Sequence, residues 1–243
     1  MQIIFGIHAV EEALTARGRA FEYVALAPGR GDARIQSLIQ LCRASGVPVR
    51  SMPRDQLTRL AKTAHHQGVV AVTAEKRYGD LEDLLAHKRA AYSFLLVLDG
   101  IEDPHNLGAL IRTAEGAGVD GIVIPERRAV GVTATVVKAS AGASEHLPIA
   151  KVTNIGRAIE EMKSRNIWTV GLDERGQKTY DELDYKMDCA LVLGAEGHGL
   201  HEQIRKKCDF LVSIPMLGKV PSLNVSVAGA IVMYEVARQR RSK

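Results

Sequence analysis

The stretch FLLVLDGIEDPHNLGALIRTAEGAGV, residues 94–119, contains the unit from which we infer the fold. It opens with the apolar run FLLVLDG, which predicts a strand that is buried on both faces. Asp103 and Pro104 then favour a turn, and Asn106 is a candidate cap for a helix that follows. The predicted buried face of that helix has four apolar residues at helical spacing: Leu107, Leu110, Ile111 and Ala114. A buried strand followed by an amphipathic helix is the repeating unit of an α/β fold.

The same pattern continues through the rest of the chain. Further candidate strands are the apolar runs at 121–125, 167–173, 190–194 and 210–215. One intervening helix has Ile155, Ala158, Ile159 and Met162 on one face, with Asn154 or Thr153 as its cap. Uniformly apolar strands separated by helices indicate a parallel sheet covered on both faces. Ligands of such sheets bind beyond the carboxyl ends of the strands, so the loops there are where we expect the chemistry.

The first third of the chain predicts a separate, smaller α/β domain. Strands are expected at 22–27 and 68–74, with a helix at 33–45 between them. We assign residues 1–75 to this domain, 76–92 to a charged linker and 93–243 to the larger domain. Residues 1–75 hold nine Lys and Arg against six Asp and Glu, so most of the net charge of +4 lies here. This surplus is compatible with a solvated surface or with a nucleic-acid-binding module.

Composition narrows the class of protein. The chain has 243 residues, 46% of them hydrophobic and 25% charged, which is typical of a globular protein. The three cysteines are far apart in sequence and form no metal-binding pair, so we expect reduced thiols and a cytoplasmic protein. No apolar run is long enough to cross a bilayer, and the N-terminus has no signal-peptide pattern, so no membrane partner is expected. The eight histidines lack ligand spacing, and we expect no metal.

Three loops that follow predicted strands hold the candidate site residues. In the first, Arg112 lies about 140° around the helix from Leu107, at about 100° per residue, and should point away from the core. It is either a functional side chain or a solvated arginine that pairs with Glu115.

The second loop, LVLGAEGHGL at 191–200, has three glycines around Glu196. Their order does not match the dinucleotide fingerprint. The loop is therefore either a ligand loop or a tight turn in which Glu196 faces the dipole of the next helix.

The third loop, IPMLGKVPSLNVSVAGA at 214–230, leads into the last helix. Asn224 is a good N-cap for that helix, and Ser222 remains outside it. Small residues after Asn224 allow another backbone segment to come close. Apolar residues occur on several sides of the helix, which suggests burial on more than one side.

Taken together, DPHNLGALIRTAEGAG, LVLGAEGHGL and IPMLGKVPSLNVSVAGAIVMYE resemble the motifs of the SpoU (TrmH) family of RNA ribose 2′-O-methyltransferases. The N-terminal FGIHAVEEAL and HHQGVVA resemble the substrate-binding domain of the branch that modifies a guanosine of 23S ribosomal RNA. The resemblance implies a SPOUT-type parallel-sheet domain tied in a trefoil knot, preceded by a small L30e-like α/β domain that binds RNA. It also implies a homodimer through the C-terminal domain and S-adenosylmethionine as cofactor.

The resemblance assigns roles to particular residues. Cofactor contacts are implied at Gly194, Gly199, Ile214, Met216 and Leu223, and catalytic roles at Asn106, Arg112, Glu196, Ser222 and Asn224. Arginine is a poor base because its pKa exceeds about 12. We therefore expect Arg112 to bind a phosphate of the RNA and to stabilise the negative charge that develops on oxygen. Glu196 is expected to orient Arg112 or a water molecule. For the two asparagines, helix capping is the alternative role.

Two alternatives remain on the same scaffold: methylation of transfer RNA, and a non-catalytic RNA-binding or ribosome-assembly protein. A nicotinamide dehydrogenase would need its glycine fingerprint after residue 99, and the residues there lack it.

Overall fold

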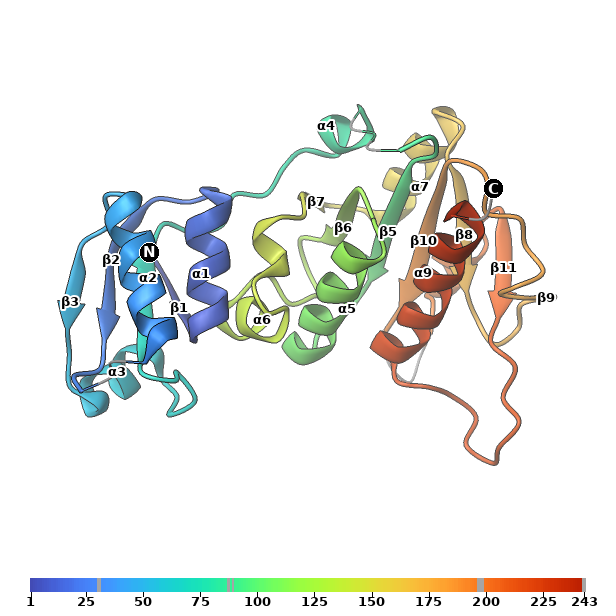
Figure 1. Ribbon diagram of the computed structural model, residues 1–243. Helices are drawn as coiled ribbons and strands as arrows, with labels where there is room; N and C mark the ends of the chain where they lie inside the picture. The colour runs from blue at the N-terminus through green and yellow to red at the C-terminus, as the bar shows by residue number, and fades with distance from the viewer. Residues whose placement is uncertain (30–31, 87, 89, 196–198, 242–243) are drawn as a thin grey trace. The chain divides into compact units, whose positions relative to one another are not determined.

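The computed structural model describes residues 1–243 except 30–31, 87, 89, 196–198 and 242–243 (Figure 1). By packing, the chain forms two compact units. Unit 1 is residues 1–77 with 131–146, and unit 2 is residues 78–130 with 147–243. The predicted boundaries at 75 and 93 had left 131–146 in the larger domain, whereas this segment packs within unit 1.

Unit 1 is built on a four-stranded sheet of order β1-β4-β2-β3. The strands are β1 (Gln2–Phe5), β2 (Phe21–Leu26), β3 (Val49–Ser51) and β4 (Val69–Thr73). β4 pairs antiparallel with β1 and β2, while β2 and β3 run parallel. The helices are α1 (Ile7–Ala16), α2 (Ala33–Ala44), α3 (Arg54–Ala61), α6 (Ala134–Ala139) and a 3-10 turn η1 (Ala143–Glu145). The predicted strands at 22–27 and 68–74 and the helix at 33–45 are thereby confirmed.

The segment 131–146 is fixed in unit 1 by buried polar contacts. The Arg19 guanidinium donates two hydrogen bonds to the Glu145 carboxylate, at 2.7 and 3.0 Å, and both side chains are 1% exposed. The Gln2 side-chain amide donates to the carbonyl of Val132 at 2.6 Å. A charge pair removed from water stays stable only while both partners remain, so this contact specifies where the segment packs.

Unit 2 is a seven-stranded sheet of order β7-β6-β5-β10-β8-β11-β9, and each neighbouring pair is parallel. The strands are β5 (Phe94–Asp99), β6 (Gly121–Pro125), β7 (Ile149–Val152), β8 (Trp168–Leu172), β9 (Lys178–Thr179), β10 (Cys189–Gly194) and β11 (Phe210–Ser213). All five strands predicted from apolar runs are present, and the parallel sheet is confirmed. The trefoil knot stays a prediction.

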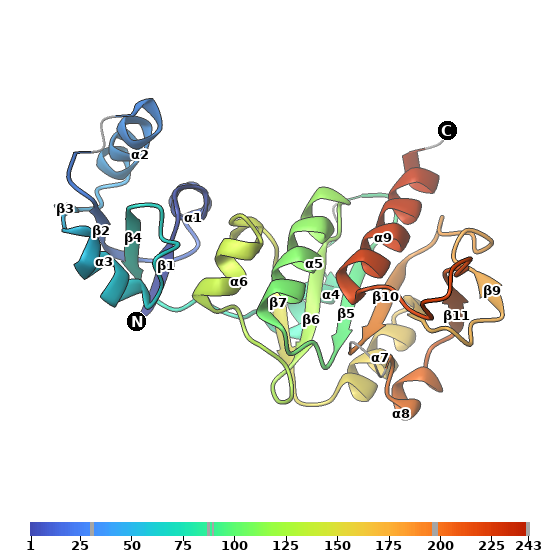
Figure 2. The same cartoon turned by 90° about the horizontal axis from the view of Figure 1, so that it is seen from below.

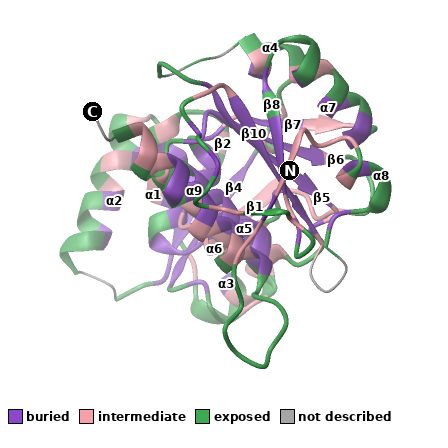
Figure 3. Ribbon diagram, turned by 90° about the vertical axis from the view of Figure 1, so that its right-hand side faces the viewer, coloured by how far each residue is buried: buried purple, intermediate pink, exposed green. Residues whose placement is uncertain are grey.

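Helices cover both faces of this sheet (Figure 2). α5 (Pro104–Gly116) and α9 (Val225–Arg241) pack together on one face. The helices α4 (Leu81–Ala86), α7 (Ile155–Ser164) and α8 (Glu202–Arg205) contribute to the core on the other face. Figure 3 shows the central strands buried and the outer faces of these helices exposed, as expected for a sheet between two helical layers.

Part of the predicted linker belongs to the core of unit 2. Leu84 of α4 is 4% exposed, and a Cβ on Gly121 would lie 2.5 Å from it. Gly79 also bridges to Ala150 beside β7. The interpretation of 76–92 as a linker is therefore wrong for residues 79–86, because their few apolar side chains are enough to fix a short helix.

The end of α9 is anchored by one arginine that the sequence pattern did not single out. The Arg240 guanidinium donates to the carbonyls of Tyr185, Met187, Ser93 and Tyr92, at 2.7 to 3.1 Å. These carbonyls precede β5 and β10, so Arg240 holds the last helix against the amino ends of the two central strands. In the described part of the chain, no helix is both long and apolar enough to span a membrane.

Candidate active site

The three motif loops leave the same edge of the unit 2 sheet. β5 and β10 are adjacent, with Gly194 opposite Asp99 where both strands end. β11 runs parallel to them on the far side of β8, and its carboxyl end leads into the 214–224 segment. The sheet therefore brings together loops that are about a hundred residues apart in sequence, as the motif positions predicted.

The start of α5 differs from the prediction in one residue. Asp103, rather than Asn106, is the cap: its carboxylate accepts hydrogen bonds from the backbone N–H groups of His105 and Asn106, at 3.1 and 3.3 Å. Pro104 occupies the first turn, where a missing N–H costs nothing. Asn106 consequently lies inside the helix with a buried side chain, and capping does not explain its presence.

A hydrogen bond joins the first and third loops. The Asn224 side-chain amide donates to the Asn106 side-chain oxygen at 3.0 Å. The Asn224 oxygen meanwhile accepts from the backbone N–H of Ser226 at 2.9 Å, which confirms its predicted capping of α9. Asn224 therefore fixes the start of α9 and ties it to the first turn of α5.

Arg112 points away from the core as predicted. It is exposed on α5, and among the described residues it makes no hydrogen bond or ion pair. The ion pair with Glu115, which was the alternative role of Arg112, does not form among the described residues. An arginine held on a packed helix with its guanidinium unpaired by described residues can receive an anionic group.

Gly194 and Gly199 are glycines for different reasons. A Cβ on Gly194 would lie 2.0 Å from the carbonyl oxygen of Gly199 and 2.3 Å from the backbone nitrogen of Leu200. Gly194 therefore serves a close approach of two stretches of backbone. Gly199 has a φ of +64°, and a Cβ there would meet only an ordinary contact, 3.9 Å from an Asp173 carboxylate oxygen, so this glycine serves a left-handed turn.

Of the other predicted site residues, four lie in the described part of the chain and one does not. Glu196 lies outside the described residues. Ser222 and Leu223 are exposed beside Asn224, Met216 is exposed, and Ile214 is half-buried at the end of β11. The structure thus places Ser222, Leu223 and Met216 on the exposed segment between β11 and α9.

One pair at this edge was missed by the sequence reasoning. The Asp99 carboxylate accepts a hydrogen bond from the backbone N–H of His201 at 3.3 Å, and His201 Nδ1 lies 2.8 Å from the same oxygen. Asp99 is 7% exposed, while the imidazole is largely exposed. The pair ties the end of the second loop to the end of β5. A polar residue closing an apolar strand was the signal that could have identified Asp99.

Family comparison decides the identity of this scaffold. Residues 93–234 match the model of the SpoU rRNA methylase family. The chain belongs to the SpoU rRNA methylase family. Its residues 3–79 match a second model, described as RNA 2′-O ribose methyltransferase substrate binding.

Curated relatives agree with this membership. The chain is 45% identical over 239 residues to the Bacillus subtilis protein YacO, whose name assigns it to the TrmH family of tRNA/rRNA methyltransferases. The alignment covers 98% of this chain and 95% of that protein. A Staphylococcus aureus relative with the same family name is 41% identical over 240 residues, covering 98% of this chain and 96% of the relative.

Solved SpoU-family structures share the fold across nearly the whole chain. The SpoU methyltransferase AviRb from Streptomyces viridochromogenes aligns with a TM-score of 0.84 and 28% identity, covering 99% of this chain and 90% of AviRb. A second AviRb structure, in complex with the cofactor AdoMet, aligns with a TM-score of 0.83 and 26% identity, covering 99% and 91%. Among the described residues of this SpoU-family chain, no group of three or more His, Cys, Asp or Glu could hold a metal ion.

Proposed function

We propose that this protein transfers a methyl group from S-adenosylmethionine to the ribose 2′-hydroxyl of a guanosine in 23S ribosomal RNA. Membership of the SpoU/TrmH family of RNA 2′-O ribose methyltransferases supports the reaction class. The observation that carries the proposal is the hydrogen bond between Asn106 and Asn224, which joins two motif loops at the ligand-binding edge of the sheet. Arg112 follows six residues after Asn106 on the same helix.

The residues at this edge fit the cofactor. S-adenosylmethionine has an apolar adenine face as well as polar ribose and carboxylate groups, and it would supply an electrophilic methyl group on sulfonium sulfur. The segment from Ile214 to Leu223 offers exposed apolar side chains together with exposed backbone: Met216, Leu217, Val220 and Leu223. Leu217 is fully exposed, and contact with an adenine ring would remove such apolar surface from water.

Arg112 is the residue that we assign to the acceptor RNA. The 2′-hydroxyl is a weak nucleophile until its proton leaves, and it must lie in line with the bond that breaks. A guanidinium is not a proton acceptor, but its planar fork can hold the neighbouring phosphate and the oxygen on which negative charge develops. Because Arg112 is exposed on a packed helix, these groups can reach it without rearranging the core.

Asn106 and Asn224 act as positioning residues in this proposal. Their mutual hydrogen bond sets the spacing between α5, which carries Arg112, and the segment that we assign to the cofactor. Ser222 lies two residues before Asn224, and we assign its hydroxyl to the acceptor side. The family resemblance adds Glu196 as the group that orients Arg112 or a water.

RNA selection is assigned to unit 1. Its residues 3–79 match the substrate-binding model of RNA 2′-O ribose methyltransferases, and its first 75 residues carry a charge surplus. Affinity for RNA should fall as salt rises, because phosphate contacts release counterions. The resemblance of this region to the branch that modifies 23S ribosomal RNA favours ribosomal over transfer RNA.

We further propose a cytoplasmic homodimer that associates through unit 2, which the family resemblance also implies to be knotted. α9 supports this with Val227 and Tyr234, which are 48% and 49% exposed. These residues are seven apart and therefore lie on one side of the helix, together with Ile231. A second copy of this chain is the occupant that we assign to this stripe.

Cofactor binding and the identity of the methylated RNA separate the proposal from its alternatives. Titration of the protein with S-adenosylmethionine should give binding, whereas a non-catalytic assembly protein would give none. Purified protein should then methylate a 23S ribosomal RNA transcript, and the modified guanosine can be mapped as a 2′-O-methyl site that is lost in a knockout strain. Methylation of transfer RNA with no modification of ribosomal RNA would contradict the substrate assignment.

A further inference from the structure

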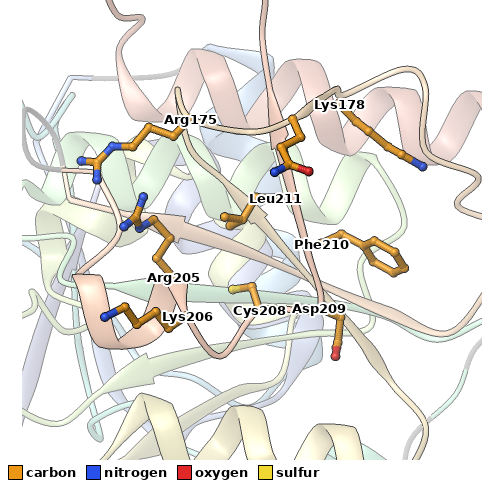
Figure 4. A pocket seen from close by; sticks show the side chains of 9 residues that line it. Arg175, Lys178, Arg205, Lys206, Cys208, Asp209, Phe210 and Leu211 are labelled. Carbon is orange, nitrogen blue, oxygen red and sulfur yellow. The ribbon is translucent and has the colours of Figure 1, made fainter.

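A basic cavity of about 540 Å³ lies beside β11 in unit 2, next to the proposed active-site edge but outside the motif loops (Figure 4). It contains four cationic side chains and one carboxylate. Its lining residues are Arg175, Gln177, Lys178, Arg205, Lys206, Cys208, Asp209, Phe210 and Leu211. The volume is within the range of roughly 300–1,000 Å³ that holds small ligands in proteins.

The cations of this cavity outnumber the carboxylates that could neutralise them. Arg175, Arg205 and Lys206 lie 4.0, 2.5 and 3.4 Å from the carboxylate of Glu202, and Arg175 also lies 3.8 Å from the carboxylate of Asp173. Three positive charges that face two negative charges leave an excess that an anion can satisfy.

The remaining charges do not remove this excess. The Asp209 carboxylate is occupied elsewhere, since it lies 2.8 Å from Lys163 Nζ and accepts from Thr169. Within the described part of the chain, Lys178 Nζ has no ion-pair partner. The cavity therefore carries positive charge that its own carboxylates do not balance.

The arrangement of the cavity suits a nucleotide within a strand. Figure 4 shows Arg175, Arg205 and Lys206 toward one end and Lys178 with Phe210 toward the other. Leu211 and Cys208 supply an apolar surface between the ends. The Phe210 ring itself packs on Trp168, with ring centroids 5.6 Å apart. Phosphates would lie at the charged ends, and a sugar or base would lie over the apolar middle.

The cavity also has a direct connection to the proposed active site. Phe210 and Leu211 belong to β11, which leads into the 214–223 segment. Arg175 Nε lies 3.8 Å from the carboxylate of Asp173, and Asp173 reaches within 3.9 Å of the Cβ position of Gly199. A strand bound here would therefore continue toward the second and third motif loops.

We propose that this cavity binds the sugar-phosphate backbone of the RNA substrate at a nucleotide other than the one that is methylated. The proposal rests on the proposed function and adds a second RNA contact, in the catalytic unit itself. Guanidinium groups favour this ligand because they bind phosphate oxygens through two parallel hydrogen bonds.

The test uses the full chain and a labelled 23S ribosomal RNA transcript. Arg175→Ala/Lys178→Ala removes one cation from each end of the cavity, and Arg157→Ala/Lys186→Ala is the matched control, since both of its residues are exposed cations of unit 2. The cavity variant should bind RNA roughly tenfold more weakly, as expected for losing charge-assisted hydrogen bonds. Its slope of log affinity against log salt should shrink by roughly 0.7–0.9 per lost phosphate contact.

A third variant tests the sign of the effect. Glu202→Gln releases the cations that Glu202 now neutralises, so RNA affinity should rise. Cofactor affinity and the melting temperature of the Arg175→Ala/Lys178→Ala variant should match the wild type, because both residues are exposed. Equal RNA affinity in the cavity variant and the control, or a fall in affinity for Glu202→Gln, would overturn the proposal.

Two further measurements separate other outcomes. If inorganic phosphate binds the cavity while the cavity variant keeps full RNA affinity, the site takes a free anion and the proposal is overturned. If the wild type binds no S-adenosylmethionine and methylates no RNA, the proposed function is wrong, and this inference, which rests on it, is wrong with it. If the wild type binds S-adenosylmethionine and methylates RNA, but the cavity variant has the same RNA affinity as the control, the proposed function stands and this inference fails.

Discussion

Replacing Gly194 by alanine tests the geometry of the second motif loop, because the structure has no space for the added methyl group. The new Cβ would lie 2.0 Å from the Gly199 carbonyl oxygen, 2.1 Å from its carbon and 2.3 Å from the Leu200 nitrogen. Real Cβ atoms essentially never approach another heavy atom within 3.0 Å. The atoms in the way belong to the backbone, so the chain at 199–200 must shift by about 1 Å rather than a side chain turning aside.

The size of the effect follows from this displacement. Overpacking that forces backbone shifts costs typically about 1–3 kcal/mol, and a clash with backbone on this scale belongs at the upper end. For a chain of this size, about 3 kcal/mol corresponds to a fall in melting temperature of roughly 6–12 °C. Since the displaced segment belongs to the proposed cofactor loops, affinity for S-adenosylmethionine should fall with it.

Gly199→Ala is the matched control. Its φ of +64° makes alanine unfavourable by about 1–2 kcal/mol, but the added Cβ would clash with nothing, since the nearest atom is 3.9 Å away. Scanning calorimetry and cofactor titration of both variants should therefore rank Gly194→Ala as clearly the more damaging. The reasoning is refuted if Gly194→Ala melts and binds cofactor like the wild type, or if the two variants are indistinguishable.

Four further predictions follow from the site and from unit 1. Arg112→Lys should lower turnover on the order of 10²-fold, nearly as much as Arg112→Ala, because the point charge of lysine cannot replace the planar guanidinium. Single-turnover methylation measures this loss, and the melting temperatures of both variants should stay unchanged. Asn224→Ala should cost about 2–4 kcal/mol by chemical denaturation, since it removes the cap of α9 and leaves a buried amide oxygen on α5 without this donor. Burial lowers the pKa of His66 below its usual 6.5, so the unfolded chain binds more protons there; stability should fall as the pH drops below about 6.5, and His66→Gln should reduce that slope in melting curves taken across pH. Glu145→Gln should destabilise unit 1 by about 3–5 kcal/mol because it strands the Arg19 charge, whereas replacing both residues by methionine should cost far less; proteolysis of unit 1 would report the difference.

Local patterns in the sequence were sufficient for most of unit 2. Apolar runs gave all five of the strands that we expected there, since buried parallel strands leave a continuous apolar signal. The short edge strands β7 and β9 were missed, because each has too few residues for a clear apolar pattern. β1 was missed for the same reason, as its four residues are too few for periodicity to be read.

The residue roles were less accessible from local patterns. Asn106 was expected to cap α5, but Asp103 three residues earlier takes that position. The hydrogen-bond partner of Asn106 is 118 residues away in sequence, and no local pattern reports such a distance. The exposure of Arg112, by contrast, follows from helical spacing alone, which is why its orientation was predicted correctly.

The path of the chain shows why the two units cannot be separated by one cut. The chain passes between them near residues 77, 130 and 146, so removing the N-terminal region leaves 131–146 without the partners that bury it. Glu145 would then lose Arg19, and a start beyond residue 86 would also remove Leu84 from the core of unit 2. A truncated chain that fails to methylate RNA would therefore report lost stability as much as lost RNA binding. Substitution of exposed cations in the intact chain, with cofactor affinity as the internal check on folding, separates these two causes because it leaves every buried contact in place.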